Sequence, residues 1–234
     1  MAAGTIVLLG GAAAAVGFFG ARWPGFVIAA PLAAVWAWLV WFFRDPQRPI
    51  PAGPGLFVCP ADGMVTDITP LGADSELGVP GRRIGVFMNV LSVHVNRAPC
   101  DGVVADKRFT RGSKEDVRRE AAWHRNESVT LLLDYRGTGF PACDRQDTQA
   151  GKPVPQVAMR QVAGMIARRI VCHPRIGDAL KRGQRIGMIR FGSRLELMLS
   201  DALNAEILVQ VGQRVFAGTS ILARHGGGAE KAQT

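Results

Sequence analysis

Short apolar runs separated by turn-forming residues fill the chain from residue 50 onward, and this pattern constrains the fold more than any other feature. Glycine, aspartate and proline punctuate the runs at regular spacing, which is typical of strands in a β sandwich or barrel. Helical periodicity is weak except over residues 114–123. The expected strands are 56–59, 65–68, 83–89, 102–109, 129–134, 157–162, 165–172, 184–191, 195–199, 206–211 and 220–223. We therefore predict a mainly β fold, a β-rich sandwich or barrel.

Two stretches near the C-terminus are alike, residues 176–191 and 207–222. Each consists of an expected strand, a glycine-containing turn with Gln-Arg, and a second expected strand. Such paired hairpins are typical of lipoyl-like β barrels. The polar segment 136–153 is rich in glycine and proline and predicts a loop. The glycine-rich end of the chain predicts a disordered tail over 224–234.

Two apolar stretches precede the β region, at residues 5–21 and 25–43. Each is near the lower length limit for a helix that spans a bilayer. We expect residues 1–45 to form a membrane-associated α-helical hairpin. Arginines follow the second stretch, and positive charge marks the cytoplasmic end of a membrane segment. The sequence thus predicts a domain over 46–223 that is held on the cytoplasmic side of the inner cell membrane.

The net charge of +9 favours a polyanionic partner, which is either nucleic acid or an anionic lipid surface. Aromatic and basic residues are not interleaved in the way that stacks bases, so we expect an anionic membrane surface and no nucleic acid. The basic run 111–125 is the expected contact with lipid head groups. Scattered cysteines fit neither a zinc site nor a compact disulfide framework, and we expect no metal. These cysteines are Cys59, Cys100, Cys143 and Cys172.

A Gly-Ser step lies inside the strand-like run IGMIRFGSRLELML, at Gly192 and Ser193. Glycine has no Cβ, so its carbonyl group can be approached closely. The hydroxyl group of the next residue is well placed to attack that carbonyl. Taken alone, the pair favours a β-bulge or a bend, where a glycine within a strand usually belongs. The other motifs of the chain decide against that simpler interpretation.

Four short motifs follow one another along the chain. They are FFRDPQR at 42–48, PADG at 60–63, MNVLSVHVNRAPCDG at 88–102 and RFGSRLEL at 190–197. In this order and at this spacing they resemble the short form of the phosphatidylserine decarboxylase proenzymes, which are pyruvoyl-dependent enzymes. The resemblance covers nearly the whole chain, from the membrane segment to about residue 223.

The resemblance implies that the chain cleaves itself between Gly192 and Ser193. Ser193 attacks the Gly192 carbonyl and converts the amide to an ester. Elimination then leaves dehydroalanine, which hydrolyses to a pyruvoyl group. A large chain, 1–192, and a small chain, 193–234, would remain associated as a heterodimer. The substrate implied is phosphatidylserine, whose amine forms a Schiff base with the pyruvoyl ketone, so that CO2 departs and phosphatidylethanolamine is released.

The resemblance also suggests which residues assist. A serine hydroxyl needs a base, and His94 in SVHVNRAP is the best available one. Asp62 in PADG would orient His94 or balance its charge, as in a hydroxyl–imidazole–carboxylate relay. One position departs from the pattern, because longer bacterial enzymes carry a second histidine, as HxxH, where this chain has Arg97. Arginine is no general base near neutral pH, so we expect Arg97 to bind the substrate carboxylate or phosphate. His94 would then serve both cleavage and decarboxylation, or another group would be recruited.

Two other functions would each explain part of the sequence. A non-enzymatic, membrane-anchored adaptor with a lipoyl-like barrel would explain the paired hairpins and the apolar N-terminus. A carrier barrel needs a lysine at a hairpin tip, however, and Lys181 lies in the turn before the strand. A pyruvoyl decarboxylase of a soluble amino acid is disfavoured by the membrane segment and the basic charge. We therefore predict the lipid decarboxylase.

Overall fold

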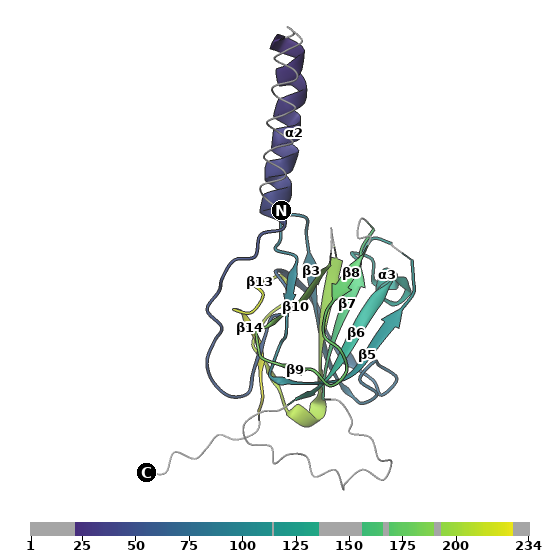
Figure 1. Cartoon of the computed structure of the whole chain (residues 1–234). Coiled ribbons are helices and arrows are strands. Elements are labelled where there is room, and N and C mark those ends of the chain that lie inside the picture. Colours follow the sequence, from purple (N-terminus) through teal and green to yellow (C-terminus); the bar gives the residue numbers. More distant parts are fainter. Residues whose placement is uncertain (1–21, 114, 136–155, 166–168, 190–192, 227–234) are drawn as a thin grey trace. The chain divides into compact units, whose positions relative to one another are not determined.

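The structure is a computed structural model that describes residues 22–113, 115–135, 156–165, 169–189 and 193–226 (Figure 1). The chain divides into two compact units, Met1–Arg44 and Asp45–Thr234. Gly192 and the predicted loop 136–153 lie outside the described residues, as does most of the predicted tail.

The described part of the first unit is one helix, α2 (Arg22–Phe42). It covers most of the second predicted membrane stretch, and its large apolar side chains from Ile28 onward are mostly exposed. No helix among the described residues meets the length and apolarity needed to cross a bilayer. The first apolar stretch, residues 5–21, is not described, so the expected hairpin stays a prediction.

The second unit is built on an antiparallel sheet with strand order β13-β2-β3-β11-β7-β6-β5-β9, which curls into a half-barrel (Figure 1). Its strands are β2 (Gly63–Leu71), β3 (Gly81–Met88), β5 (Gly102–Thr110), β6 (Ser128–Tyr135), β7 (Val157–Ala163), β9 (Ala179–Leu180), β11 (Ser193–Ser200) and β13 (Arg214–Val215). The predicted mainly β fold is therefore confirmed.

Two three-stranded sheets complete the unit, one ordered β1-β14-β12 and the other β4-β10-β8. Their strands are β1 (Leu56–Val58), β4 (Val95–Arg97), β8 (Ile170–Cys172), β10 (Arg185–Ile189), β12 (Glu206–Ile207) and β14 (Ile221–Arg224). A short helix, α3 (Glu120–Arg125), precedes β6, and a 3-10 turn, η1 (Asp201–Leu203), follows β11.

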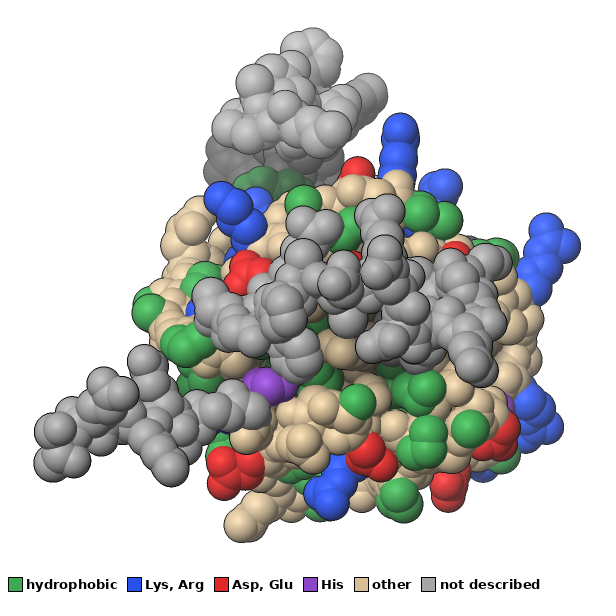
Figure 2. Space-filling view, turned by 90° about the horizontal axis from the view of Figure 1, so that it is seen from below, with side chains coloured by type: hydrophobic (Ala, Val, Ile, Leu, Met, Phe, Trp, Pro, Cys, Tyr) green, Lys and Arg blue, Asp and Glu red, His purple; other side chains and the backbone are tan. Residues whose placement is uncertain are grey.

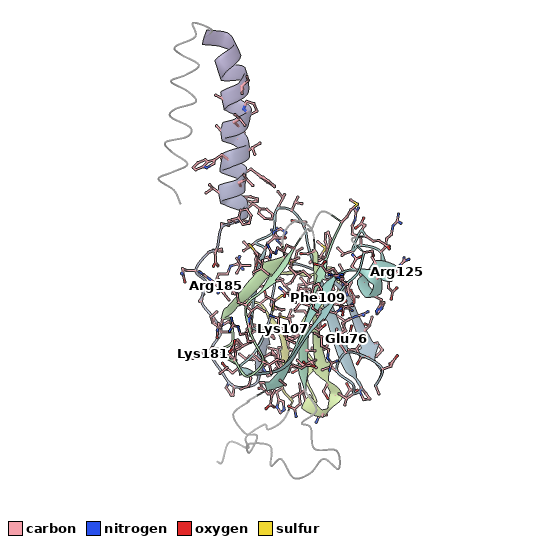
Figure 3. The ribbon with its side chains drawn as sticks, turned by 45° about the vertical axis from the view of Figure 1, so that its right-hand side comes forward. Glu76, Lys107, Phe109, Arg125, Lys181 and Arg185 are labelled. Atoms are coloured by element: carbon pink, nitrogen blue, oxygen red, sulfur yellow. The ribbon has the colours of Figure 1, made fainter. Side chains whose placement is uncertain are left out.

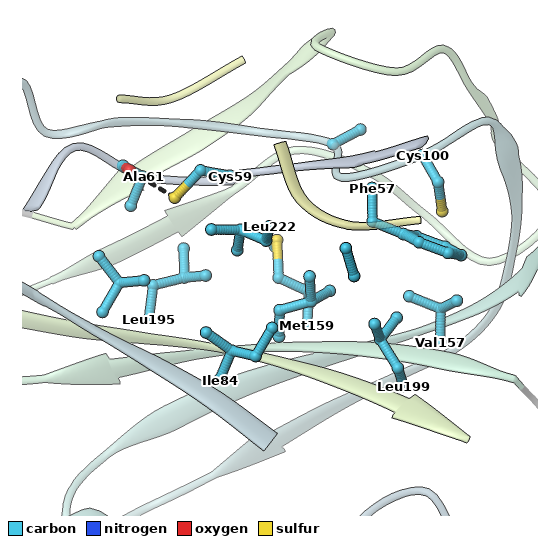
Figure 4. Packing of buried hydrophobic residues seen from close by; sticks show 14 of the residues in the cluster. Phe57, Cys59, Ala61, Ile84, Cys100, Val157, Met159, Leu195, Leu199 and Leu222 are labelled. Atoms are coloured by element: carbon cyan, nitrogen blue, oxygen red, sulfur yellow. Dashed lines mark hydrogen bonds between the residues drawn. The ribbon is translucent and has the colours of Figure 1, made fainter. Parts of the chain in front are cut away.

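The main core lies between the large sheet and the two small ones (Figure 4). It joins Leu197 of β11 and Met159 of β7 to Phe57 of β1, Leu222 of β14 and Ile186 of β10. Because side chains alternate along a strand, β11 directs Leu195, Leu197 and Leu199 into this core and its other residues to the opposite face. All eight residues of β11 are buried, so both faces of this strand are covered.

Several predicted elements differ in extent or pairing. The predicted helix over 114–123 is only α3, and the expected strand 206–211 ends at Ile207. The two similar C-terminal stretches do not fold as simple hairpins. In the first, β9 pairs with β5, whereas β10 pairs with β4 and β8. In the second, β12 pairs with β14 and β13 pairs with β2, because the strands before and after each turn are recruited by different sheets.

Gly63 of the PADG motif should not tolerate a side chain. A Cβ at Gly63 would lie 2.1 Å from the backbone oxygen of Phe87, on the neighbouring strand β3. We expect Gly63→Ala to lower the free energy of unfolding of the folded protein by about 3 kcal/mol or more, since the ladder must open to admit the methyl group. Urea unfolding followed by tryptophan fluorescence measures the change.

The matched control is Gly78→Ala. Gly78 has a φ of +74° but nothing within 4 Å of a Cβ, so only the left-handed backbone conformation is penalised, by about 1 kcal/mol. An equal loss in the two variants would show that the close approach at Gly63 is not what demands a glycine there.

Candidate active site

Ser193 is the first residue of β11, the strand between β3 and β7 in the large sheet. In register it lies opposite Met88, where β3 ends, and opposite Ala163, where β7 ends. Three adjacent strands therefore reach the same edge of the sheet at this residue. Ser193 is fully buried and lies on the same face of β11 as the leucines of the core. Its hydroxyl group is thus enclosed at the end of the apolar core.

A line of buried polar groups leads to this hydroxyl. Ser193 Oγ lies 3.3 Å from the thioether sulfur of Met88, to which it donates, and Asn96 Nδ2 lies 3.8 Å from the same sulfur. Gln161 Nε2 of β7 donates to Asn96 Oδ1 at 2.8 Å. Each of these residues is fully buried. The other amide atom, Gln161 Oε1, has no hydrogen-bond partner among the described residues.

Neither Asn96 nor Gln161 stands out in the sequence as a candidate site residue. Asn96 stands inside the SVHVNRAP motif, so the motif itself carried a signal for it. Gln161 lies in the strand VAMRQVA, where only its polarity distinguishes it from the apolar residues that point into the core. The two residues come from separate sheets, Asn96 from β4 and Gln161 from β7, and only the tertiary structure brings them into hydrogen-bond contact.

His94 precedes β4 and is fully buried. Its Nδ1 lies 2.8 Å from the backbone oxygen of Ser92. A carbonyl oxygen only accepts, so Nδ1 carries the proton and the lone pair of the neutral ring is on Nε2. His94 precedes Asn96 by two residues, so the segment that carries His94 is brought towards Ser193 through the contacts of Asn96 and Met88.

Asp62 lies just before β2 and is nearly buried. Its Oδ1 accepts from the backbone N–H of Ala217 at 2.7 Å, and its Oδ2 accepts from Arg48 Nη2 at 2.8 Å. The hydrogen bond to Asp62 raises the pKa of the Arg48 guanidinium, despite partial burial that acts against it. The described partners of Asp62 are thus a cation and a backbone amide, and its place in a relay with His94 stays a prediction.

Arg97 is also held by the segment that follows the first unit. Its Nη2 lies 2.7 Å from Asp45 Oδ1, and its Nη1 donates to the backbone oxygen of Gly183 at 3.0 Å. Asp45 forms a second ion pair with Arg185 of β10. These contacts give Arg97 an anchoring role. Its expected contact with the substrate stays a prediction.

On the opposite face of β11, directly after Ser193, lies a buried charge cluster. Arg194 Nε donates to Glu196 at 2.8 Å, Nη1 to Thr66 Oγ1 at 2.7 Å and Nη2 to Asp67 Oδ1 at 2.8 Å. The Arg194 guanidinium lies 3.6 Å from the centre of the Trp123 ring, a stacked cation–π contact. The side chain of Arg194 is 1% exposed.

Two further arginines extend this cluster across the sheet. Arg160 Nη1 of β7 lies 2.7 Å from Glu76 and 3.6 Å from Glu196, and its Nη2 donates to the backbone oxygen of Trp123 at 2.8 Å. Arg83 of β3 lies 3.9 Å from Glu196. Glu76 lies on the side of the domain where α3 carries Arg125 (Figure 3). The charges are thus mutually compensated beneath α3.

The pKa values of Asp67, Arg194 and Cys59 are shifted from their usual values. Burial alone would raise the pKa of Asp67, but hydrogen bonds and the charge of Arg194 outweigh it and lower that pKa below its usual value. Burial likewise opposes the charge of Arg194, yet Asp67 and Glu196 raise its pKa. Burial raises the pKa of the Cys59 thiol to about 12. Cys59, beside the PADG motif, is therefore no nucleophile or base at neutral pH.

Comparison with known proteins identifies similar chains. The profile of a family described as phosphatidylserine decarboxylase matches residues 35–223, which contain all four motifs. The phosphatidylserine decarboxylase proenzyme of Burkholderia ambifaria (strain MC40-6) is 38% identical over 209 residues, 89% of this chain and 86% of that protein. The proenzyme of the same name from Geotalea uraniireducens (strain Rf4) is 41% identical over 196 residues, 84% of this chain and 83% of that protein. The proenzyme of the same name from Trichlorobacter lovleyi is 43% identical over 185 residues, which are 79% of this chain and 75% of that protein.

The lowered pKa of Asp67 makes part of the stability depend on pH. A carboxylate with a depressed pKa in the folded state stabilises above its unfolded value of about 3.9, and that contribution is lost as the pH falls through the folded value. We expect Asp67→Asn to reduce the free energy of unfolding by about 2 kcal/mol at pH 7, because charged hydrogen bonds to Arg194 are lost. The difference from the unsubstituted protein should shrink as the pH is lowered below about 4.

Urea unfolding at a series of pH values between 7 and 3 measures this difference. Asp116→Asn serves as the control, since Asp116 pairs with the exposed Arg118 and should matter little at any pH. A difference for Asp67→Asn that does not change with pH would contradict the assignment.

Proposed function

This chain belongs to the phosphatidylserine decarboxylase family, and we propose that it is a self-cleaving proenzyme whose reacting group is made from Ser193. It is a carboxy-lyase that removes CO2 from phosphatidylserine and leaves phosphatidylethanolamine. The observation that supports Ser193 most directly is its position. It is buried at the first residue of a central strand, beside Met88 and the segment of His94.

In the proposed cleavage, Ser193 Oγ attacks the carbonyl carbon of Gly192, and the peptide C–N bond breaks as an ester forms. Loss of the Cα proton of residue 193 then expels the Gly192 carboxylate and leaves dehydroalanine. Its enamine becomes an imine, to which water adds, and ammonia leaves. The product is a pyruvoyl group at the start of the small chain. Burial of Ser193 supports this sequence, because bulk water would otherwise hydrolyse the ester.

The attack requires a group that takes the hydroxyl proton. The thioether of Met88 accepts only a weak hydrogen bond. His94 is the base in this proposal, and the hydrogen bond of its Nδ1 to Ser92 supports that role, since it leaves the basic lone pair on Nε2. Asp62 is the proposed carboxylate. Through its hydrogen bond with Arg48, Asp62 also holds the segment that carries Arg48 next to the site.

The residues around Ser193 fit a pyruvoyl group. The ketone of such a group supplies an acceptor for the electrons released when CO2 departs. Met88 offers an apolar, polarisable surface to its methyl group, and Asn96 offers amide N–H donors near its oxygens. The buried oxygen Gln161 Oε1 is available to accept from an amino group of the substrate.

We also propose that the edge of the sheet at Ser193 faces the membrane. Large apolar side chains are exposed in the loops and strand ends of this edge, which we call the apolar rim. The rim consists of Met64, Val90, Leu91, Phe109, Met165 and Phe216. Leu91 is 58% exposed in the loop after Met88, and Met165 is 64% exposed in the loop after Ala163. A lipid substrate needs an apolar path to the site, and exposed apolar groups around the site supply it.

On the face of the molecule seen in Figure 2, acidic and basic side chains are interspersed among apolar and polar ones. The basic run 111–125 joins the ends of β5 and β6 at the Ser193 edge, which supports its proposed contact with anionic head groups. The proposed location is the cytoplasmic face of the inner membrane, in keeping with the arginines that follow α2.

The cleavage is tested by intact-mass analysis of the purified protein beside Ser193→Ala, His94→Gln and Asp62→Asn. We expect fragments 1–192 and 193–234, the smaller one blocked by pyruvoyl, and a single chain for Ser193→Ala. His94→Gln should slow cleavage by about a hundredfold or more, because general-base assistance is lost. Asp62→Asn should slow it by a smaller factor of about ten.

A single intact chain in the folded, unsubstituted protein would overturn the pyruvoyl proposal and favour the membrane-anchored adaptor. Cleavage of His94→Gln at the original rate would remove His94 from the mechanism while leaving Ser193 in place.

The apolar rim is tested by sedimentation with vesicles of phosphatidylserine and phosphatidylcholine. Replacing both Val90 and Leu91 with serine should weaken vesicle binding about tenfold, since two exposed apolar side chains no longer enter the interface. Reversing the charges of Arg118 and Arg119 should weaken it further. Ile176→Ser is the control, because Ile176 is 63% exposed beside the first part of β5, away from the rim. Equal binding of all variants would refute the proposed orientation.

A further inference from the structure

The residue that follows Ser193 has an unusual environment for a charged group. Arg194 is the largest of the fully buried side chains, although arginine is seldom fully buried unless it is paired. The motif RFGSRLEL contains Arg194 and Glu196, yet the proposed chemistry at Ser193 uses neither of them. Their role therefore requires a separate account.

The Arg194 guanidinium crosses one strand to reach the next. In register, Glu196 of β11 lies opposite Gly85 of β3, and Gly85 lies opposite Asp67 of β2. A Cβ at Gly85 would lie 2.0 Å from Arg194 Nη2, so the absence of a side chain at Gly85 makes room for the crossing. Trp123 covers the other side of the guanidinium. The arginine is thus fixed from below by β3, at its tip by β2 and from above by α3.

Cleavage before residue 193 changes what holds β11 in place. Ser193 stops being an interior residue and becomes the first residue of a separate chain. Chain ends fray unless they are tied down, since few contacts oppose their opening. Among the described residues, the ladder to β3 and β7 begins at Ser193 itself. The first side chain that can restrain the new end from the opposite face of the sheet is Arg194.

We propose that Arg194 is a positioning residue that clamps the chain end created by cleavage, so that the reacting group at residue 193 stays in the site. The inference rests on the proposed cleavage at Ser193. The clamp fixes the orientation of the chain end more than it adds to the free energy of unfolding, because a buried ion cluster is often no more stabilising than apolar packing of the same volume. A guanidinium fork fixes the geometry of its acceptors, which an apolar side chain cannot do.

The contacts assign the clamp to Arg194 in particular. Its three nitrogens bond to Glu196, Thr66 and Asp67, so that both rotation and sliding of the side chain are opposed. Met198 lies further along the same face of β11 and packs in a small apolar cluster. This face therefore admits apolar packing, and the charged group is placed where the chain end will form.

The test uses the full chain with Arg194→Ala, which leaves a space shaped for guanidinium between Asp67 and Trp123. We expect cleavage of the purified proenzyme to slow about tenfold or more, and the kcat of the cleaved enzyme to fall about tenfold with KM changed less than about threefold. Millimolar guanidinium chloride should restore both rates in part, whereas equal urea or sodium chloride should not. Arg194→Lys should lie between Arg194→Ala and the unsubstituted protein.

The matched control is Arg108→Ala, which removes an equal charge from an exposed ion pair with Asp106 and should change neither rate. Cleavage and kcat at unsubstituted levels in Arg194→Ala would overturn the clamp. The clamp would also be overturned if the losses of cleavage and kcat only tracked the folded fraction of the variant, and neither guanidinium chloride nor the Arg194→Lys substitution restored them. If Arg194→Ala does not fold, the kcat and KM of Arg194→Lys decide in the same way. Absence of cleavage in the unsubstituted chain would refute the proposed function instead.

Discussion

The antiparallel ladder of β3, β11 and β7 is the constraint on which the rest of the structure depends. It pairs every residue from Ser193 to Leu199 on both sides, so the start of β11 is fixed relative to the ends of both neighbours. Alternation then gives the strand two distinct faces, with Ser193 and the leucines in the core and Arg194 and Glu196 on the other side. One strand thereby carries the reacting residue, the core and the charge cluster.

Two ion pairs join motifs that are distant in the sequence. Asp45 and Arg48 belong to FFRDPQR, and they bind Arg97 of SVHVNRAP and Asp62 of PADG respectively. Charged pairs at low exposure are costly to break, because each leaves an uncompensated charge. The segment after the first unit is therefore attached to the two loops that flank the site. These charged residues therefore have a structural role that does not require contact with a substrate.

The buried polar groups near Ser193 depend on one another in a similar way. An amide in an apolar core is stabilised only when its hydrogen bonds are made, and Gln161 meets this requirement in part by donating to Asn96. Asn96 in turn reaches Met88, whose sulfur also receives the Ser193 hydroxyl. The site is thus assembled from β3, β4, β7 and β11, and none of these strands alone would specify it.

The sequence by itself determined the mainly β fold, most of the strands and the Gly192–Ser193 step, because apolar alternation and turn residues are local signals. It also placed His94 and Asp62 in motifs, through resemblance to the family. Strands as short as β4, β9 and β13 left no periodic pattern to detect, and their pairing depends on contacts between distant segments. Only the tertiary structure decided that Gln161 meets Asn96, that Asp45 holds Arg97, and that Arg194 crosses Gly85 to reach Asp67. Each of these contacts joins residues far apart in the chain, and packing of one strand against another, rather than any local preference, selects them.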